Sequence, residues 1–207
     1  MKLYTNPLSS NCRKIIAVAE HLGLTLELQE IDFRKGEHKS PEFLAMNPNG
    51  KIPVLVDGAR TLWESNAIMA YVCSKVDNTD LWPKSDARYS IMQWLFWEAQ
   101  HLTPVTGGVV FEAVVKRLLD LGEPDAKKIE EGQAKFRDLA RVLDGHLAKN
   151  RFLVGDKATL ADFSNAAILA YAMPPALPIN EFPQVQRWLA DLHEIPAWKN
   201  TAPKMPG

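Results

Sequence analysis

The feature that most constrains the fold is a change in the hydrophobic pattern near residues 78–84. Before this point, short apolar runs such as 52–56 and 60–63 alternate with helix-length segments, a pattern typical of an α/β domain. After it, apolar residues recur every three or four positions over long stretches, which predicts helices alone. The sequence therefore predicts an α/β domain over 1–77, a linker over 78–84 and an all-helical domain over 85–207.

The first part reads in the order β-α-β, an irregular crossing, and then β-β-α. Gly23 follows the first helix and Asp57-Gly58 follows the third strand, and both are typical stop or turn signals. Ser65 is a suitable N-terminal cap for the last helix of this part. The expected strands are 2–5, 24–31, 52–56 and 60–63, and the expected helices are 11–22, 41–45 and 65–75.

The second part reads as helices separated by short breaks. Pro104 and the pair Gly107-Gly108 are expected to interrupt a long helix that begins near residue 85. Thr159 and Asp162 stand in the positions of a capping box, which indicates a role in fold stability and not in chemistry. The remaining expected helices are 125–149, 159–172 and 183–193.

The charge balance and the cysteine content narrow the class of protein. The chain has 207 residues and a net charge of −1, with 24 Lys and Arg against 25 Asp and Glu. Nucleic-acid and membrane-surface proteins carry a basic excess, so neither class is expected. Two cysteines, Cys12 and Cys73, do not make a disulfide framework or a metal cluster. Because no secretion signal or span-length apolar run is found, we expect a soluble protein of the reducing cytoplasm.

The first of three chemically informative segments is Pro7–Arg13, a polar turn at the start of a helix. Helix N-termini present unpaired N–H groups and a partial positive charge, so a hydroxyl there can stabilise an anion such as a thiolate. One hydrogen bond to a charged group contributes about 1.5–3 kcal/mol, which lowers a thiol pKa by roughly one to two units. The alternative is that Ser9 or Ser10 only caps the helix.

The second segment is Asn47–Val54, in which an Asn-Gly turn precedes Ile52-Pro53. The Ile52-Pro53 bond is a candidate cis peptide, and the Ile52 backbone would then be free to pair with an extended peptide ligand. The alternative is an ordinary trans proline at the start of an edge strand.

The third segment is Trp63–Ile68, where a strand ends and a helix begins. A ligand carboxylate would accept hydrogen bonds from the Ser65 hydroxyl and backbone, and Glu64 would meet an ammonium group. This pair suits the head group of an amino acid. The alternative is a capped helix with an exposed acid.

Taken together, these segments resemble the glutathione transferase superfamily, closest to its serine-using phi, theta and delta-like branches and their bacterial relatives. The resemblance covers nearly the whole chain. It implies a thioredoxin-like first domain with a mixed four-stranded sheet, an all-helical second domain, a homodimer and a role in detoxification. The motifs that carry it are Ser9-x-x-Cys12-Arg13, Gly36–Phe43, Asn47–Leu55, Glu64–Ile68 and Gly155–Asp162.

The same resemblance implies roles for individual residues around glutathione. Ser9 falls on the catalytic serine, with Ser10, Asn11 and Cys12 as rivals, and Cys12 would instead support disulfide reduction. The glutathione-binding positions are His38, Lys39 and Lys51 at the glycine end, Ile52 before the family's cis proline Pro53 at the cysteinyl part, and Glu64 with Ser65 at the γ-glutamyl end.

A second pocket, for an electrophile, is expected in the helical domain. Trp94, Trp97 and His101 lie at i, i+3 and i+7 on one helix face, and Phe111 follows. The run 171–176 is a candidate for another wall. A pocket of such side chains favours aromatic or apolar electrophiles. The alternative is that the tryptophans belong to the core or to a dimer interface.

The first functional hypothesis is therefore an enzyme that activates reduced glutathione as a thiolate, for attack on an electrophilic carbon or a peroxide, without a metal. A second hypothesis is a binding protein that kept the fold and lost the chemistry. A third is a glutathione-dependent disulfide reductase that uses Cys12.

Overall fold

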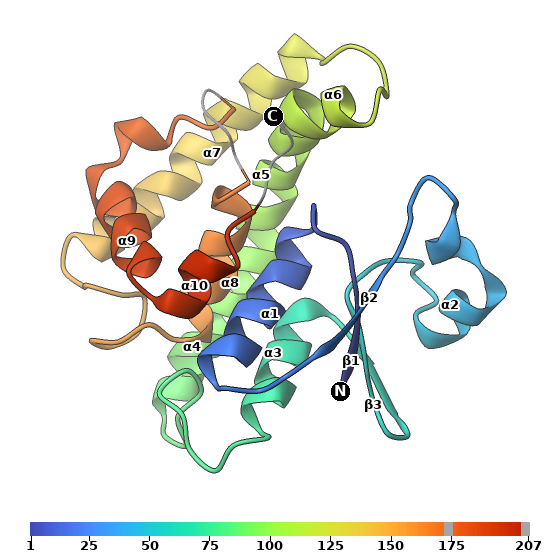
Figure 1. Ribbon diagram of the computed structural model, residues 1–207. Coiled ribbons are helices and arrows are strands. Elements are labelled where there is room, and N and C mark those ends of the chain that lie inside the picture. The colour runs from blue at the N-terminus through green and yellow to red at the C-terminus, as the bar shows by residue number, and fades with distance from the viewer. Residues whose placement is uncertain (172–175, 204–207) are drawn as a thin grey trace.

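A four-stranded mixed sheet organises the N-terminal part of the computed structural model, which describes residues 1–171 and 176–203 (Figure 1). The strand order is β2-β1-β3-β4, with β1 parallel to β2 and β3 antiparallel to both of its neighbours. The predicted β-α-β and β-β-α order is confirmed. The elements are β1 (Lys2–Thr5), α1 (Ser10–His21), β2 (Glu27–Glu30), α2 (Pro41–Met46), β3 (Val54–Asp57), β4 (Arg60–Trp63) and α3 (Ser65–Cys73), with a 3₁₀ turn at Glu37–Lys39.

Apolar side chains cover both faces of this sheet. Leu3 and Leu55 point into the main core, which α1 and α3 share on one face. A smaller cluster of Ile31, Phe43 and Val54 joins α2 to the other face. The edge strand β2 is exposed along its whole length and is shorter than the predicted 24–31.

The prediction that Ser65 caps α3 is wrong. The helix begins at Ser65 itself, and Glu64 holds the cap position without a side-chain hydrogen bond. The Ser65 hydroxyl donates instead to Asn11 Oδ1 at 3.2 Å. Ser65 therefore links the starts of α3 and α1.

A continuous helical column runs from Ala87 to Leu118 and contains two π-helical turns. Its parts are α4 (Ala87–Trp97), η2 (Glu98–Leu102), α5 (Thr103–Val110), η3 (Phe111–Val115) and α6 (Lys116–Leu118). The predicted interruption at Pro104 and Gly107-Gly108 is wrong. Pro104 lies in the first turn of α5, directly after the π-helical turn η2, where the missing N–H of proline is tolerated.

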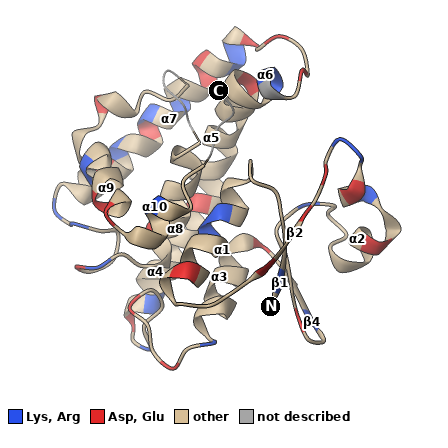
Figure 2. Ribbon diagram, in the orientation of Figure 1, with Lys and Arg blue, Asp and Glu red and all other residues tan. Residues whose placement is uncertain are grey.

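The remaining helices surround one central helix. They are α7 (Ala126–Leu147), α8 (Leu160–Leu169), α9 (Pro183–His193) and α10 (Pro196–Asn200), with a 3₁₀ turn at Ile179–Glu181. Every residue of α8 is buried, so α8 forms the centre of the helical part. Basic and acidic residues are mixed along α7 and α9 (Figure 2). Among the described helices, none combines the length and the apolar character that a membrane span requires.

Helix α1 connects the sheet to the helical part through a buried cation. Lys14 Nζ contacts Asn66 Oδ1 at 2.8 Å, Ser164 Oγ at 3.0 Å and Glu98 Oε2 at 3.4 Å. These oxygens come from α3, α8 and η2. The side chains of Lys14 and Glu98 are both buried, so the two charges depend on this arrangement for compensation.

The predicted capping box at the start of α8 is confirmed. Asp162 is fully buried and accepts hydrogen bonds from the Thr159 N–H at 2.8 Å, the Leu153 N–H at 2.8 Å and the Trp188 indole N–H at 2.9 Å. One carboxylate thus satisfies donors from three segments.

We expect Asp162→Ala to lower the free energy of unfolding by about 3–5 kcal/mol, because several buried donors lose their acceptor together. Asp138→Ala is the matched control, since Asp138 is exposed and, among the described residues, paired only with Arg141, and its cost should stay below about 1 kcal/mol. Urea unfolding measures both. Equal losses in the two variants would contradict the structural role of Asp162.

Candidate functional site

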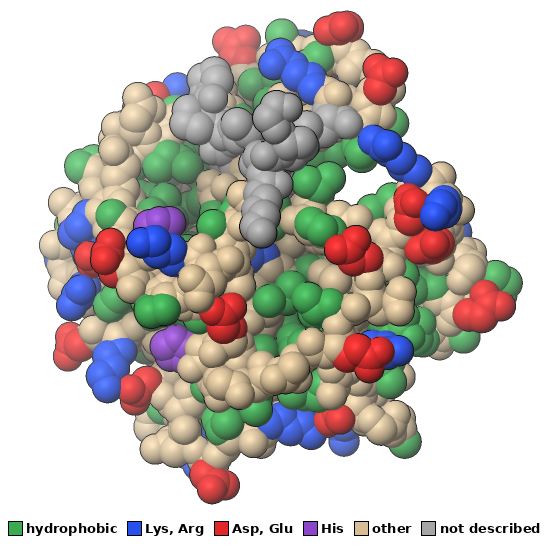
Figure 3. All heavy atoms as spheres, in the orientation of Figure 1, with side chains coloured by type: hydrophobic (Ala, Val, Ile, Leu, Met, Phe, Trp, Pro, Cys, Tyr) green, Lys and Arg blue, Asp and Glu red, His purple; other side chains and the backbone are tan. Residues whose placement is uncertain are grey.

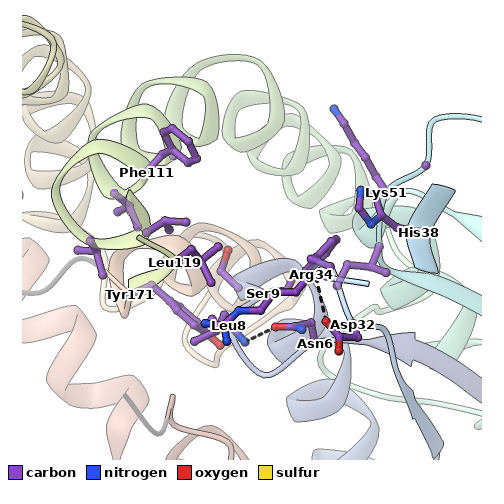
Figure 4. A pocket seen from close by; sticks show the side chains of 18 of the residues that line it. Asn6, Leu8, Ser9, Asp32, Arg34, His38, Lys51, Phe111, Leu119 and Tyr171 are labelled. Atoms are coloured by element: carbon purple, nitrogen blue, oxygen red, sulfur yellow. Dashed lines mark hydrogen bonds between the residues drawn. The ribbon is translucent and has the colours of Figure 1, made fainter. Parts of the chain in front are cut away.

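A cleft of about 820 Å³ lies between the sheet and the helical column. Figure 3 shows the surface hollowed between the α5–α6 region and the lobe that carries α2. Figure 4 shows Ser9 between two unlike flanks, with His38 and Lys51 on one side and Phe111 on the other. The polar flank comprises Asn6, Asp32, Arg34, His38, Lys39, Asn49 and Lys51, and the apolar wall comprises Val110, Phe111, Val114, Val115, Leu119, Ile168 and Tyr171.

Ser9 lies at the centre of the cleft because it is the N-cap of α1. Its backbone is extended, its N–H donates to Asn6 O at 2.9 Å, and its hydroxyl accepts from the Cys12 N–H at 3.3 Å. The hydroxyl is the acceptor in this contact and also hydrogen-bonds with the Cys12 thiol, so an anion above the helix end would compete with that thiol for the hydroxyl proton. Ser9 and Ser10 line the cleft, whereas Asn11 is engaged with Ser65.

Cys12 is buried beneath this turn, with 1% of its surface exposed. Burial raises the pKa of the Cys12 thiol, against weaker lowering by hydrogen bonds with Ser9 and Thr5. A buried thiol with a raised pKa is a poor nucleophile. The geometry therefore disfavours Cys12 as the reactive group.

His38, Lys39 and Lys51 come together around Gly50. Gly50 has a φ of 58°, and a Cβ there would lie 2.8 Å from Lys39 Nζ and 3.1 Å from His38 O. Glycine is therefore required by both the backbone angle and the close approach. Asn47 stabilises the loop by donating from Nδ2 to Lys51 O at 2.6 Å.

His38 carries an unsatisfied polar atom at this flank. Among the described residues, its Nδ1 is buried without a hydrogen-bond partner, and its ring packs against Phe33 at 4.9 Å. A buried polar atom without a partner is costly. This flank is therefore suited to an anionic or polar ligand group.

The Ile52-Pro53 peptide bond is cis, as predicted. Ile52 lines the cleft, whereas Pro53 is buried behind it. The Ile52 backbone thus stands where an extended ligand would pass.

Glu64 and Ser65 lie beside the cleft and not in its lining. Glu64 has a φ of 71°, a conformation that costs a non-glycine residue about 1–3 kcal/mol. The next residues hold this turn in place: Ser65 contacts Asn11, and the Asn66 side chain donates to Leu95 O at 3.1 Å and Glu98 Oε2 at 3.0 Å. The strained turn is thereby fixed next to the first turn of α1.

The structure separates the three residues predicted for the electrophile pocket. Phe111 lines the cleft from the π-helical turn η3. Trp97 lies elsewhere, with its ring 5.3 Å from Trp94, which in turn lies 5.0 Å from His146 on α7. The His101 ring lies 6.4 Å from the Trp97 ring, tilted by 42°. These aromatic contacts belong to helix packing, so we no longer assign Trp97 and His101 to the cleft.

Tyr171 forms part of the apolar wall and also contacts the Ser9 turn. Its hydroxyl donates to Pro7 O at 3.1 Å, and burial raises its pKa to about 12. Of the rest of the predicted wall, 172–175 lie outside the described residues. Ala176 is described and is buried.

Several lining residues were missed by the sequence reasoning, among them Asn6, Asp32 and Arg34. They lie on irregular loops, where no periodicity marks which side chain faces inward. Val110 follows the π-helical turn η2 and Val114 lies in η3, and both were missed because these turns change the helical register. Within the described residues, no group of three His, Cys, Asp or Glu side chains is placed to hold a metal ion.

Comparison with known proteins gives a consistent result along the chain. Family models match residues 1–74 as "Glutathione S-transferase, N-terminal domain" and 99–196 as the corresponding C-terminal domain. Glutathione S-transferase 3 of Zea mays is 37% identical, with 100% of this chain and 95% of the relative covered. A probable glutathione S-transferase GSTF2 of Oryza sativa subsp. japonica is 36% identical, with 99% and 97% covered.

Solved structures agree with these sequence relatives. Glutathione transferase F7 of Populus trichocarpa superposes with a TM-score of 0.92 at 32% identity, over 100% of this chain and 99% of that one. The transferase URE2P6 of Phanerochaete chrysosporium, solved with oxidized glutathione, gives 0.86 at 36% identity, over 97% and 93%. The chain thus shares with these structures the fold of a thioredoxin-like sheet domain followed by a helical domain.

The burial of both cysteines predicts slow thiol chemistry in the native protein. The pKa of Cys73 is raised to about 12 and that of Cys12 is also raised, both chiefly by burial. Since a raised thiol pKa lowers the thiolate fraction at pH 8, an aromatic disulfide reagent should titrate neither thiol promptly. Both thiols should react at once in denaturant. Rapid labelling of native Cys12 would contradict the buried position.

Proposed function

The chain belongs to the glutathione S-transferase family and is a glutathione transferase. We propose that it ionises glutathione at Ser9 and directs the sulfur toward an electrophile held against the apolar wall. The observation that carries this proposal is the position of Ser9, at a helix N-terminus between a cationic flank and an apolar wall. With an electrophilic carbon, the reaction forms a carbon–sulfur bond. With a peroxide, the sulfur takes up one oxygen as the O–O bond breaks, which oxidises the thiol to a sulfenic acid and releases an alcohol.

We assign the glycine carboxylate of glutathione to Lys39, Lys51 and His38. The two lysines have no acidic partner among the described residues, and the buried His38 Nδ1 lacks a hydrogen-bond partner. A carboxylate satisfies both needs, because its oxygens accept charge-assisted hydrogen bonds. The backbone of Ile52, before the cis Pro53, is assigned to the cysteinyl part.

The γ-glutamyl end is assigned to Glu64 and Ser65. This assignment is supported by the fixed turn beside α1, in which Ser65 contacts Asn11, two residues after Ser9. Glu64 would pair with the ammonium group, and the N–H groups at the start of α3 would bind the carboxylate.

The role of Ser9 is to stabilise the thiolate. A hydrogen bond from its hydroxyl contributes about 1.5–3 kcal/mol, and the positive end of α1 adds about 0.3–1 kcal/mol. The reference pKa of a thiol is near 8.5, so these terms bring a large share of the sulfur to the nucleophilic form at neutral pH. No metal is required for this step.

The apolar wall supports aromatic or apolar electrophiles. Phe111, Val110 and Ile168 offer contact area and no charge to a ring seated above Ser9. A disulfide reductase that uses Cys12 has less support, since that thiol is buried. A non-catalytic binding protein is the remaining alternative, and turnover decides it.

We also propose a homodimer. Tyr89 and Phe96 on α4 expose 72% and 63% of their surface, and Met92 lies between them on the same face. An exposed apolar stripe of this kind is typical of a protein interface. The proposed compartment is the cytoplasm, for which the support is the pair of free cysteines.

Ser9→Ala should raise the pKa of bound glutathione by about one to two units, because the thiolate loses one charged hydrogen bond. Ultraviolet absorbance of the thiolate across a pH series measures this pKa. The turnover number with a chloronitrobenzene should fall about tenfold or more at neutral pH.

Ser10→Ala is the matched control, since Ser10 lines the same cleft without being the cap of α1. In this variant, the pKa of bound glutathione and the turnover number should remain near those of the unaltered enzyme. If Ser10→Ala shifts the pKa and Ser9→Ala does not, the assignment of Ser9 is wrong. Retention on glutathione resin without turnover of any electrophile or peroxide would favour the binding-protein alternative.

Phe96→Glu should convert the dimer to monomer, because a carboxylate within the stripe is costly to bury. Light scattering should give twice 23.2 kDa for the unaltered chain and 23.2 kDa for the variant. Val142→Glu on α7 is the control, since Val142 is exposed outside the stripe. A monomeric unaltered chain would contradict the proposal.

A further inference from the structure

The cleft contains more positive charge than the carboxylate of the glycine end requires. Its lining includes three permanent cations, Arg34, Lys39 and Lys51, against one carboxylate, Asp32, which leaves a balance of +2. The whole chain has a net charge of −1. Positive charge is therefore concentrated in this cleft, on three exposed residues, where it attracts an anion.

Asp32 does not neutralise Arg34, because it is committed to its own loop. Its Oδ1 accepts from the backbone N–H groups of Arg34 at 2.8 Å and Lys35 at 3.3 Å, and its Oδ2 faces Lys35 Nζ at 3.6 Å. The guanidinium of Arg34 has no hydrogen-bond or ion-pair partner within residues 1–171 and 176–203. Arg34 therefore has a fixed backbone and an unused charged group.

Arg34 is also separate from the cluster that surrounds Gly50. Lys39 Nζ lies over Gly50, next to Lys51, whereas Arg34 belongs to the turn that follows β2. Figure 4 shows Arg34 beside Asp32 in the cleft, and Lys51 on the flank that also carries His38. Arg34 thus lines the same cleft as Ser9 from a segment other than the Gly50 loop.

We propose that Arg34 binds an anionic group on the electrophile, so that the enzyme prefers aromatic electrophiles that carry a carboxylate or sulfonate over neutral ones. This inference rests on the proposed function for the reaction itself. The apolar wall accepts the ring, and the opposite flank supplies a planar guanidinium whose paired N–H groups match two acidic oxygens. The apolar preference expected from the sequence then applies to the ring alone.

The test compares two electrophiles that differ in one group, 4-chloro-3,5-dinitrobenzoate and its neutral amide. In both, the sulfur of glutathione forms a bond to the ring carbon as the carbon–chlorine bond breaks, chloride leaves, and the thiol proton passes to solvent. The measured quantity is the ratio of kcat/KM for the anion to kcat/KM for the amide. Comparing this ratio between variants cancels the intrinsic reactivities of the two compounds.

Arg34→Gln should lower the ratio about tenfold, the effect of one charged hydrogen bond, and Arg34→Lys should retain part of it. The matched control is Lys35→Gln, which removes the same charge from the same turn at a side chain that is 74% exposed. In Lys35→Gln, the ratio should stay within about twofold of that of the unaltered enzyme, since only a screened, long-range attraction to the anion is lost.

Two results would overturn the proposal. One is a ratio that is the same in Arg34→Gln as in the unaltered enzyme. The other is a higher KM for glutathione in Arg34→Gln with the ratio unchanged, which would assign Arg34 to glutathione.

Failure of the proposed function remains distinguishable, because binding is measured without turnover. Calorimetry with 3,5-dinitrobenzoate and 3,5-dinitrobenzamide, with and without S-methylglutathione, gives the same ratio as dissociation constants. Loss of the preference for the anion in Arg34→Gln supports the anion site even if the enzyme turns over neither of the two chlorinated electrophiles. No preference in the unaltered protein refutes it, whether or not glutathione binds.

Discussion

The buried cation of Lys14 is the constraint on which the relation between the two halves of the molecule depends. An ammonium group on α1 can be buried only if oxygens surround it, and these come from Asn66, Ser164 and Glu98 on three other elements. Removing one partner of such a pair typically costs about 3–5 kcal/mol. The sheet, the helical column and α8 are therefore fixed in one arrangement around α1.

This arrangement determines where the first turn of α1 points. Further along α1, Arg13 donates to Thr201 O at 2.8 Å and Trp198 O at 2.9 Å, and its guanidinium lies 3.7 Å from the Trp198 ring. On the N-terminal side of this turn, the Tyr171 hydroxyl donates a hydrogen bond to Pro7 O. Because both ends of this segment are held by the helical part, the Ser9 turn faces the cleft in a defined position.

The two flanks of the cleft differ because they come from different kinds of structure. The polar flank is built from loops after β2 and before β3, where backbone groups need local hydrogen bonds and charged side chains remain exposed. The apolar wall is built from α5, η3 and α8, which turn apolar faces inward. A ligand with a charged peptide portion and an apolar partner fits this asymmetry.

The sequence by itself determined the element order and the capping box of Thr159 and Asp162, because turn residues and local spacing act over a few positions. It also gave the candidates Ser9, His38 and Lys51 through their motifs. The cis Ile52-Pro53 bond was expected from the family resemblance, since the segment alone also allows a trans proline. Only the tertiary structure decided that Phe111 faces the cleft while Trp97 packs against Trp94, and that Arg34 lines the polar flank without a partner among the described residues. Those outcomes depend on π-helical register and on loops packed against distant segments, which no local pattern records.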